Sequence, residues 1–450
     1  MINPFRFFAA GSDKPLLDDA QEIDRRYRRH RLAIMLSITL GYGSYYTCRL
    51  GLSIAKKPLI DGGFLTVDQL GIIGSAIFYG YAIGKLTNGF LADHANVRKL
   101  FFCGLLCSAL VNLVMGSSTF FWVLVVVWGL NGWFQAFGAI SCLVILANWF
   151  SNHERGRYYG IWSASHSIGE GITFVGTAAL VTFWGWRMGF WAPGVFCVCV
   201  AFAALLFLRD RPRTLGLPAI EDWRNNHGAA IDTRNGRPIK TVTIQLQIFK
   251  RPAVWILGLA SATMYITRYA INSWGILYLQ EAKGYSLMEA GGILGINTIA
   301  GIAGCVAYGF ISDKLFQARR PPVTLMFGAV ELLSLFVIFF APPDQQLLMT
   351  IAFAVYGFTL SGLLAVLGGL FAVDIVPKMA AGAVGGFIGI FSYVGAALQE
   401  RISGYLIDSN LTMVDGVRHY DFGSAIMFWI GASVVSLILA ASLWRVKAVD

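Results

Sequence analysis

Long uncharged stretches divide the chain into apolar segments, each about as long as a helix that crosses a membrane. A transmembrane helix needs about 20 apolar residues, and twelve stretches of this kind follow one another along the sequence. They span residues 32–55, 69–92, 99–117, 120–148, 158–183, 188–208, 252–279, 288–312, 321–342, 346–373, 380–407 and 422–444. The pattern predicts an all-α polytopic membrane protein with 12 transmembrane helices.

One long polar stretch separates the first six segments from the last six. Residues 209–251 are rich in Arg and Lys, with Pro, Asn and Gly between them. We interpret this stretch as a solvated cytoplasmic central loop that links two six-helix bundles. The predicted organisation is a cytoplasmic tail at 1–31, a bundle at 32–208, the central loop at 209–251, a second bundle at 252–444 and a cytoplasmic C-terminus at 445–450.

The two halves of the chain repeat one another. The pattern Gly-Phe-x-x-Asp ends the second segment of each half, at residues 89–93 and 309–313. An arginine in the first segment of each half, Arg49 or Arg268, precedes the motif aspartate by 44 or 45 residues. A matched offset of this kind indicates a duplicated six-helix unit, with pseudo-two-fold symmetry between the halves.

Composition removes several classes of protein. The chain is 56% hydrophobic and only 13% charged, whereas a soluble domain carries about 25% charged residues. This argues against a soluble enzyme or a nucleic-acid-binding protein, despite the net charge of +10. We find no phosphate-binding glycine loop, zinc-ligand spacing or nucleophile motif, so we expect no catalytic residues, metal or cofactor.

The distribution of basic residues predicts the orientation. Most of the 35 Lys and Arg residues fall on the side of the membrane that carries the N-terminus in this arrangement. Cytoplasmic loops carry an excess of Lys and Arg. We therefore expect both termini in the cytoplasm.

Two arginines lie well inside predicted membrane helices and have no acidic neighbour in sequence. Arg49 and Arg268 have no acidic residue within one helical turn in sequence, and a charge at the bilayer centre costs about 2.5–3.5 kcal/mol on insertion scales. Repeat symmetry places them opposite one another, where two guanidiniums without carboxylate partners form an electropositive pocket. Their fork of donors fits a phosphate or a carboxylate. The alternative is that each arginine reaches the interface or pairs with a distant acid.

Other charged groups in the segments have open interpretations. Lys85 supplies a third positive charge or extends to the headgroups, and His166 contacts the ligand or is a packing residue. Glu170 follows His166 by one turn, a spacing at which the two side chains could pair. Arg401 is expected to form a local ion pair with Glu400.

The loop after the second segment, at residues 89–99, resembles the corresponding signature of the major facilitator superfamily. In that family, an acid and the basic residues after it latch helix ends on the cytoplasmic side. The resemblance implies a gating role, with helix capping and topology charge as the alternative. The gating residues implied are Asp93, Arg98, Lys99, Asp313 and Lys314.

Motifs inside the segments resemble the organophosphate:phosphate antiporter family of that superfamily, over nearly the whole chain. They are Tyr45, Tyr46 and Arg49; Gly84 and Lys85; Trp149, Glu154, Arg155 and Gly156; Trp162, His166 and Gly169; Arg268, Ile271 and Trp274; and Val376, Pro377, Lys378 and Tyr393. The resemblance implies a major facilitator fold and makes Arg49 and Arg268 the phosphate-binding pair. It implies that the other substrate-binding residues are Lys85, His166, Tyr45, Tyr265, Tyr393 and Trp162.

The same resemblance implies a function and its setting. We expect a monomeric carrier in a bacterial inner membrane that exchanges hexose-6-phosphate, such as glucose-6-phosphate, for inorganic phosphate. The alternatives are a glycerol-3-phosphate carrier, a membrane sensor of hexose phosphate with a partner kinase, and a carrier of another anion. Protons carried by His166 and Glu170 would make phosphate–proton symport viable.

Several positions differ from the family pattern. Leu50 replaces a frequent Lys, and Asn297 with Thr298 stands near a usual acid. The charged pair of some hexose-phosphate carriers is replaced by Gly385 and Ile388. These differences leave the organic group of the substrate open.

Overall fold

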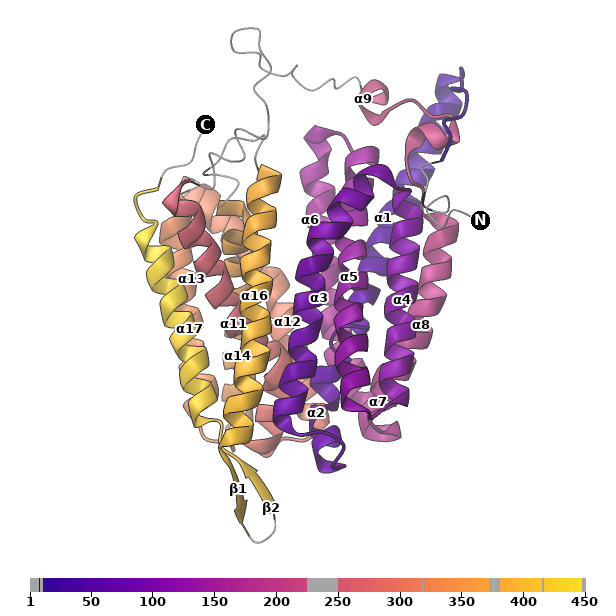
Figure 1. Cartoon of the computed structure of the whole chain (residues 1–450). Coiled ribbons are helices and arrows are strands. Elements are labelled where there is room, and N and C mark those ends of the chain that lie inside the picture. Colours follow the sequence, from indigo (N-terminus) through magenta and orange to yellow (C-terminus); the bar gives the residue numbers. More distant parts are fainter. Residues whose placement is uncertain are drawn as a thin grey trace.

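A computed structural model of the chain describes residue 8 and residues 11–224, 250–317, 319–371, 375, 381–414 and 417–446. The helices form two groups that stand side by side (Figure 1). The N-terminal half consists of α1 (Ala20–Thr47), α2 (Gly51–Asp61), α3 (Val67–His94), α4 (Val97–Ser117), α5 (Phe121–Trp149), α6 (Asn152–Ile172), a π-helical turn η2 (Thr173–Thr177), α7 (Ala178–Trp184) and α8 (Met188–Phe207). A 3₁₀ turn η3 (Pro212–Leu215) and α9 (Ile220–Trp223) follow it.

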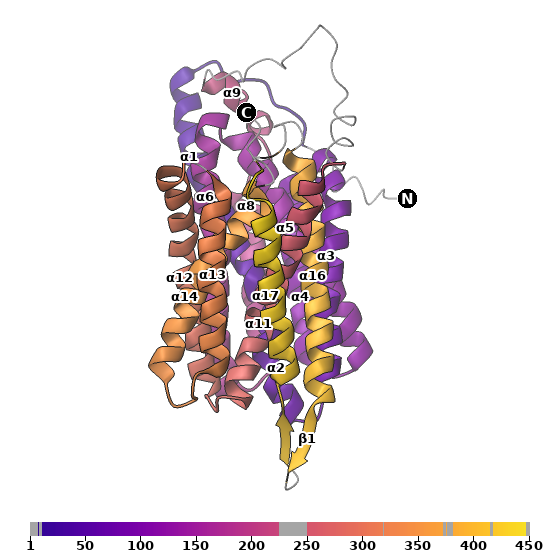
Figure 2. The same ribbon diagram turned by 90° about the vertical axis from the view of Figure 1, so that its left-hand side faces the viewer.

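The C-terminal half has the same general plan. It consists of α11 (Pro252–Glu281), α12 (Leu287–Phe310), η5 (Ile311–Leu315), α13 (Arg320–Phe340), α14 (Gln346–Ala365), η6 (Val366–Leu370), α16 (Ala381–Ser409) and α17 (Gly423–Ser442). A short antiparallel hairpin of β1 (Leu411–Val414) and β2 (Val417–Tyr420) lies between α16 and α17. The hairpin projects from one end of the bundle, and α9 lies at the other (Figure 2); we call these the hairpin end and the α9 end.

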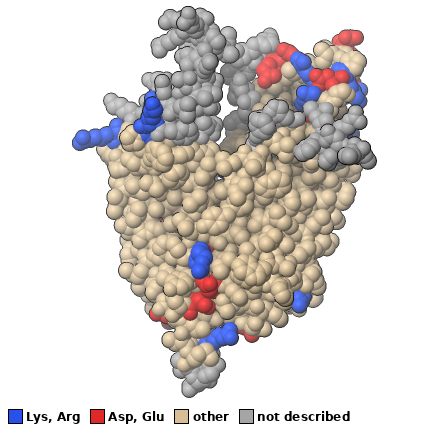
Figure 3. Space-filling view, in the orientation of Figure 1, with Lys and Arg blue, Asp and Glu red and all other residues tan. Residues whose placement is uncertain are grey.

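The helical membrane architecture predicted from hydropathy is confirmed. Ten helices in the described part of the chain are long and apolar enough to cross a membrane. Helices α1 and α16, with 28 and 29 residues, run alongside them. Charged side chains gather toward the two ends of the visible face, with a wide uncharged band between them (Figure 3). This band has the character of a surface that faces lipid.

The first predicted segment, at 32–55, is broken and is not the continuous span that its hydropathy predicts. Helix α1 ends at Thr47 and α2 begins at Gly51. The break frees backbone carbonyls inside the bundle, where each unpaired group is costly. Asn112 of α4 and Asn131 of α5 both donate from Nδ2 to the carbonyl oxygen of Cys48, each at 2.9 Å. Side chains of neighbouring helices therefore stabilise the break.

In the described part of the chain, the main contacts between the halves are those of α3 with α16, of α2 with α11, and of α12 with α6, η2 and α7. Glycines of α3 and α16 allow one close approach of the two halves. A Cβ atom added at Gly71 would lie 2.9 Å from the Cα atom of Gly404. Only small residues allow backbones to approach so closely, so these glycines hold the halves together near the hairpin end.

A buried ion pair crosses between the halves on the hairpin side of the break. The ammonium of Lys56 in α2 lies 3.3 Å from a carboxylate oxygen of Glu400 in α16, and both side chains are fully buried. Lys56 also donates to Ser273 at 2.8 Å and stands over the ring of Trp274, both in α11. Its charge therefore has a partner, as a buried charge requires.

Two further ion pairs cross between the halves at the hairpin end. Lys57 pairs with Glu281, and Arg401 pairs with Asp68 at the start of α3. The expected local pair of Glu400 with Arg401 is wrong, because the two neighbours bind different residues of the other half. Sequence proximity favoured the local pair, but packing of α16 against α2 and α3 offers each side chain a better-placed partner.

The composition of the stretch after α8 predicted a solvated linker, but its first part packs against α1. Within residues 209–224, the indole of Trp223 stacks on Tyr27 of α1, with ring centroids 4.3 Å apart. The hydroxyl of Tyr27 donates to the carbonyl oxygen of Pro218. The first part of this stretch is therefore attached to the N-terminal half, and residues 225–249 lie outside the described residues.

Candidate functional site

Arg49 lies in the break between α1 and α2, not inside a continuous helix. Its side chain is only 5% exposed. The guanidinium donates from one Nη atom to the hydroxyl of Tyr269 in α11, at 3.1 Å. Its carbon lies 4.8 Å from the ring centre of Tyr81 and 5.6 Å from those of Tyr46 and Tyr393. A ring of aromatic faces therefore surrounds this cation.

The charge of Arg49 is not compensated by an acid. No carboxylate of the described residues forms an ion pair with it, and its buried Nε has no hydrogen-bond partner there. A buried charge without a counter-ion costs several kcal/mol on the order-of-magnitude scale for desolvated ions. Arg49 is therefore a buried cation without a counter-ion among the described residues.

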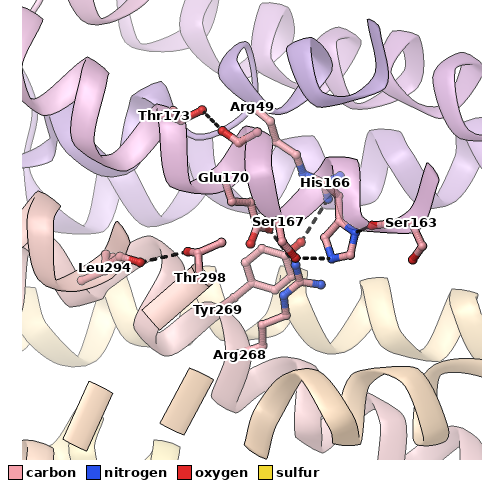
Figure 4. A network of polar contacts seen from close by, with 11 residues as sticks. Arg49, Ser163, His166, Ser167, Glu170, Thr173, Arg268, Tyr269, Leu294 and Thr298 are labelled. Atoms are coloured by element: carbon pink, nitrogen blue, oxygen red, sulfur yellow. Dashed lines mark hydrogen bonds and ion pairs between the residues drawn. The ribbon is translucent and has the colours of Figure 1, made fainter. Parts of the chain in front are cut away.

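Arg268 differs, and this corrects the expectation of two unpaired arginines. It lies in the middle of α11, and one of its Nη atoms is 2.7 Å from a carboxylate oxygen of Glu170 in α6 (Figure 4). Both side chains are buried, at 7% and 8% exposure. The pair joins the two halves at their centre. Sequence spacing misses it because the two residues are 98 positions apart.

The one-turn spacing suggested that His166 pairs with Glu170, but the two side chains form no hydrogen bond or ion pair with each other. Its Nδ1 bonds to the carbonyl oxygen of Ser163, and its Nε2 lies 3.3 Å from the hydroxyl of Ser167. Its ring stands 5.8 Å from that of Tyr46. The histidine therefore lies beside the arginine cluster, held by its own helix.

Lys85 reaches the same tyrosines as Arg49. Its ammonium lies 5.0 Å from the ring centre of Tyr393 and 5.7 Å from that of Tyr81. On the other side, the guanidinium carbon of Arg268 lies 5.7 Å from the ring of Tyr265, which itself contacts Tyr393. The tyrosines therefore connect three cations from α3, the α1–α2 break and α11.

Two residues named from the sequence lie apart from this cluster. The hydroxyl of Tyr45 donates to the carbonyl oxygen of Phe101 at 2.8 Å, inside the N-terminal half. Trp162 packs against Tyr42 with ring centroids 4.8 Å apart. The place expected for Tyr45 is taken by Tyr46, the next residue along the chain.

The sequence held a signal for Tyr46. It precedes Arg49 by three residues, as Tyr265 precedes Arg268 by three, so the repeat pairs Tyr46 with Tyr265. Tyr269, which contacts both arginines, follows Arg268 directly. The place of Tyr81 depends on how α3 packs against α16, which spacing along the chain does not show.

Two small cavities flank the arginines. One has a volume of about 20 Å³ and is lined in part by His166, Glu170, Arg268 and Asn297. The other, also about 20 Å³, is lined by Arg49 and neighbouring residues of α2, α3 and α11. Such a volume holds about one water molecule, whereas ligand pockets measure about 300–1,000 Å³. The site is therefore closed around its own side chains.

Two of the predicted gating residues, Arg98 and Asp313, make contacts within their own halves. Arg98 donates from Nε to the carbonyl oxygen of Leu205 at the end of α8, at 2.8 Å. Asp313 pairs with Arg320 at 2.7 Å, which joins η5 to α13. These contacts fit helix capping.

Two further predicted gating residues, Lys99 and Lys314, contact residues of the same half. The backbone N–H of Lys99 donates to the side chain of Asn96, an N-cap, and the ammonium of Lys314 stands over Phe310. The side chain of Asp93 lies outside the described residues. Gating by all five stays a prediction.

An acidic group at the α9 end has a shifted pKa. Glu154, at the start of α6, lies 2.6 Å from Arg31 and 3.3 Å from Arg224. Partial burial alone would raise the pKa of Glu154, but the hydrogen bond and charge of Arg31 outweigh it, so the pKa is lowered. Glu154 is therefore a structural anion that connects α1, α6 and the segment after α8.

The site is suited to binding an anion. Among the described residues, no group of three or more His, Cys, Asp or Glu side chains is placed to hold a metal ion. What the site offers is guanidinium and ammonium donors with tyrosine hydroxyls, a set that matches the oxygens of a phosphate.

The chain matches one protein family and is similar to several bacterial membrane proteins. The sequence profile of the Major Facilitator Superfamily matches residues 34–399. The membrane sensor protein UhpC of Salmonella typhimurium is 33% identical over 394 residues, covering 87% of this chain and 89% of the relative. A probable hexose phosphate transport protein of Chlamydia pneumoniae is 32% identical, covering 90% and 91%. The glycerol-3-phosphate transporter of Bacillus subtilis is 31% identical, covering 95% of each.

Solved structures share the fold at lower identity. A bacterial homologue of the human lysosomal transporter Spinster, inward-facing and unoccupied, gives a TM-score of 0.74 at 16% identity, covering 94% of this chain and 99% of that one. The nucleoside transporter NupG gives a TM-score of 0.67 at 16% identity, covering 93% of this chain and 100% of that one.

Proposed function

Because the chain belongs to the major facilitator superfamily, a family of transporters and not of enzymes, we propose that it moves an organic phosphate across a membrane in exchange for inorganic phosphate. The organic phosphate is a hexose-6-phosphate such as glucose-6-phosphate. One chain contributes both halves and both arginines, so the proposed carrier works as a monomer.

The observation that carries the proposal is the meeting of Arg49 and Arg268 on one tyrosine at the centre of the molecule. Arg49 donates to the hydroxyl of Tyr269, and the guanidinium carbon of Arg268 lies 5.4 Å from the ring of the same residue. The two arginines come from opposite halves. A phosphate between them would receive charge-assisted hydrogen bonds from both sides, and its binding would therefore respond to the relative position of the halves.

The relatives support a phosphate ester as the substrate class. Two of them are named as transporters of hexose phosphate and glycerol-3-phosphate, and this chain covers at least 90% of each. The polar lining at Ser167, Asn272, Asn297 and Ser361 could receive the hydroxyl groups of a sugar once the cavity widens. Arg49 and Arg268 would hold the phosphate end, with the ammonium of Lys85 close to the tyrosines around Arg49.

Exchange follows from the charge of the empty site. A guanidinium without a counter-ion, such as that of Arg49, raises the free energy of a closed and empty carrier. Bound phosphate supplies the missing negative charge, so the loaded carrier changes conformation more readily than the empty one. The carrier therefore changes conformation in either direction mainly with a phosphate compound bound. Inward movement of one phosphate compound is then coupled to outward movement of another, which is exchange.

The hairpin end is closed by contacts between the halves, as alternating access requires of one end at a time. The ion pairs of Lys56, Lys57 and Arg401 join the halves there, and their separation would open the site on that side. We assign the α9 end to the cytoplasm of a bacterial inner membrane, because the Lys- and Arg-rich segments meet there. Both termini then lie in the cytoplasm.

The proposal is tested by uptake of radiolabelled phosphate into proteoliposomes loaded with phosphate, glucose-6-phosphate, glycerol-3-phosphate or buffer alone. Internal phosphate compounds are expected to accelerate uptake, and their ranking identifies the organic substrate. Arg49→Gln is expected to abolish uptake. Arg187→Gln is the matched control, because Arg187 lies outside the site and donates to the carbonyl oxygen of Gly116.

A sensor is the second candidate, favoured by the 33% identity to a membrane sensor protein. Binding of glucose-6-phosphate without any phosphate flux in the wild type would support the sensor over the carrier. Failure to bind any phosphate compound would overturn both.

A further inference from the structure

Glu170 stands where a substrate anion would contact Arg268. Its carboxylate oxygen accepts a hydrogen bond from the guanidinium at 2.7 Å, in a buried setting. The carboxylate comes from α6 of the N-terminal half and the guanidinium from α11 of the C-terminal half. The Glu170–Arg268 ion pair therefore connects the two halves, as a phosphate bound between Arg49 and Arg268 would do.

No second cation holds the Glu170 carboxylate in the described part of the chain. Its ion pair is with Arg268, and the ring nitrogens of His166, one turn earlier, bond to Ser163 and Ser167. The cavity beside the pair measures about 20 Å³, too little for a phosphate to enter beside the carboxylate. A phosphate that binds the Nη atom of Arg268 now bonded to Glu170 therefore displaces the carboxylate from it.

Arg49 provides the internal comparison. It has tyrosine rings and a tyrosine hydroxyl around it, but no carboxylate among the described residues. The empty site thus contains one compensated and one uncompensated arginine. Phosphate gains the full interaction with Arg49, but at Arg268 it replaces an interaction that already exists.

We propose that Glu170 is a resident counter-ion that occupies the place of the substrate on Arg268 in the empty protein, lowers the affinity for phosphate, and lets part of the population return empty. This inference rests on the proposed function. The carboxylate neutralises Arg268 while no substrate is bound, which reduces the cost of closing an empty site. Glu170 therefore sets how strictly transport is coupled to exchange.

The decisive experiment measures the affinity of the purified full-length protein for inorganic phosphate by isothermal titration calorimetry, in the wild type and in Glu170→Gln. Glutamine keeps the shape but removes the charge, so Arg268 no longer has to give up an ion pair. The affinity is expected to rise about tenfold, which corresponds to about 1.4 kcal/mol, because phosphate then no longer replaces a charge-assisted hydrogen bond. Glu170→Asp is expected to bind phosphate like the wild type.

A matched control is available in Glu331→Gln. Glu331 is a buried carboxylate of the C-terminal half that bonds to Ser433 of α17, so its neutralisation should leave phosphate affinity unchanged. The same variants are then compared in proteoliposomes. Uptake into vesicles without internal phosphate should fall in Glu170→Gln relative to uptake into phosphate-loaded vesicles.

The outcomes separate the inference from the proposed function. The counter-ion role of Glu170 is supported if Glu170→Gln binds phosphate more tightly and takes up relatively less phosphate into vesicles that contain none. Unchanged or weaker binding in Glu170→Gln, in protein that melts as the wild type does, overturns the counter-ion but leaves a phosphate carrier. No phosphate binding by the wild type overturns the proposed function, and this inference falls with it.

Discussion

The α1–α2 segment and helix α11 occupy equivalent places in the two halves, and each brings one arginine to the centre of the molecule. Arg49 lies between two helices, since α1 ends at Thr47 and α2 begins at Gly51. Arg268 lies in the middle of the unbroken α11. Tyrosines surround Arg49, whereas Arg268 has a carboxylate at 2.7 Å.

The comparison shows what a duplication keeps and what it lets change. Both halves keep an arginine three residues after a tyrosine, so the repeat fixes where the charge stands. The means of tolerating that charge have diverged. One half uses aromatic faces and a local break of the backbone, and the other uses an ion pair to the opposite half.

The largest expected effect removes the uncompensated arginine. Arg49→Gln should lower phosphate affinity about 100-fold or more, because two charge-assisted hydrogen bonds of about 1.5–3 kcal/mol each are lost. The double variant Arg268→Gln with Glu170→Gln, which removes the whole pair, should lose only about tenfold, since Arg268 binds phosphate at the expense of Glu170. Titration calorimetry measures both. Equal losses would show that the two arginines are energetically alike.

Hydropathy was sufficient to predict the helices, because lipid imposes one length and one composition on every spanning segment. It could not predict the break at Arg49, since the groups that stabilise the break are side chains of α4 and α5, such as Asn112 and Asn131. The pair of Arg268 with Glu170 was hidden for the same reason. Its partners are close only after the halves assemble.

The candidate site shows the same limit in more detail. Repeat spacing placed both arginines and, applied strictly, would have chosen Tyr46 over Tyr45. The rotation of α1 decides that Tyr45 bonds to Phe101 inside its own half. A one-residue error on a helix turns a side chain by about 100°, which follows from 3.6 residues per turn.

The second prediction concerns Lys56, which α2 places against α11 and α16. Glu400→Gln leaves the buried Lys56 ammonium without its carboxylate, and breaking a buried pair in this way costs about 3–5 kcal/mol. The hairpin end should therefore open. Arg401→Gln, one residue further on α16, breaks a pair in which Arg401 is 43% exposed, and the expected cost is only about 0–1 kcal/mol.

Opening at the hairpin end can be measured by distances between spin labels. Cysteines at Asp61 and Ala282, exposed at the ends of α2 and α11, would carry the labels, in a background without the seven native cysteines. Longer distances in Glu400→Gln but not in Arg401→Gln are expected. An unchanged distance in both would mean that the contacts left in each variant, the Lys57–Glu281 ion pair and the glycine contact of α3 with α16, are enough to keep this end closed.

The third prediction tests the support of the break. Asn131→Leu removes a donor to the Cys48 carbonyl inside the bundle, and leaving such a group less satisfied costs about 1–3 kcal/mol. We expect a lower melting temperature and weaker phosphate binding together, because Arg49 is held by this backbone. Asn148→Leu on the same helix α5 loses only a contact of 3.5 Å to Asp210 and should change neither. A change in stability without any change in phosphate affinity would separate the break from the site.

The smallest expected effects distinguish two neighbouring tyrosines of α1. Tyr46 faces Arg49, so Tyr46→Phe should weaken phosphate binding about threefold, the size of one neutral hydrogen bond of about 0.5–1.5 kcal/mol, with an unchanged melting temperature. Tyr45→Phe removes the bond to Phe101 and should lower the melting temperature while phosphate affinity stays the same. Each variant is the control for the other, and calorimetry with thermal melting measures both properties. If Tyr45→Phe instead weakened binding and Tyr46→Phe did not, α1 in the phosphate-bound state would be rotated, and the contrast between the α1–α2 segment and α11 would belong to the closed, empty state alone.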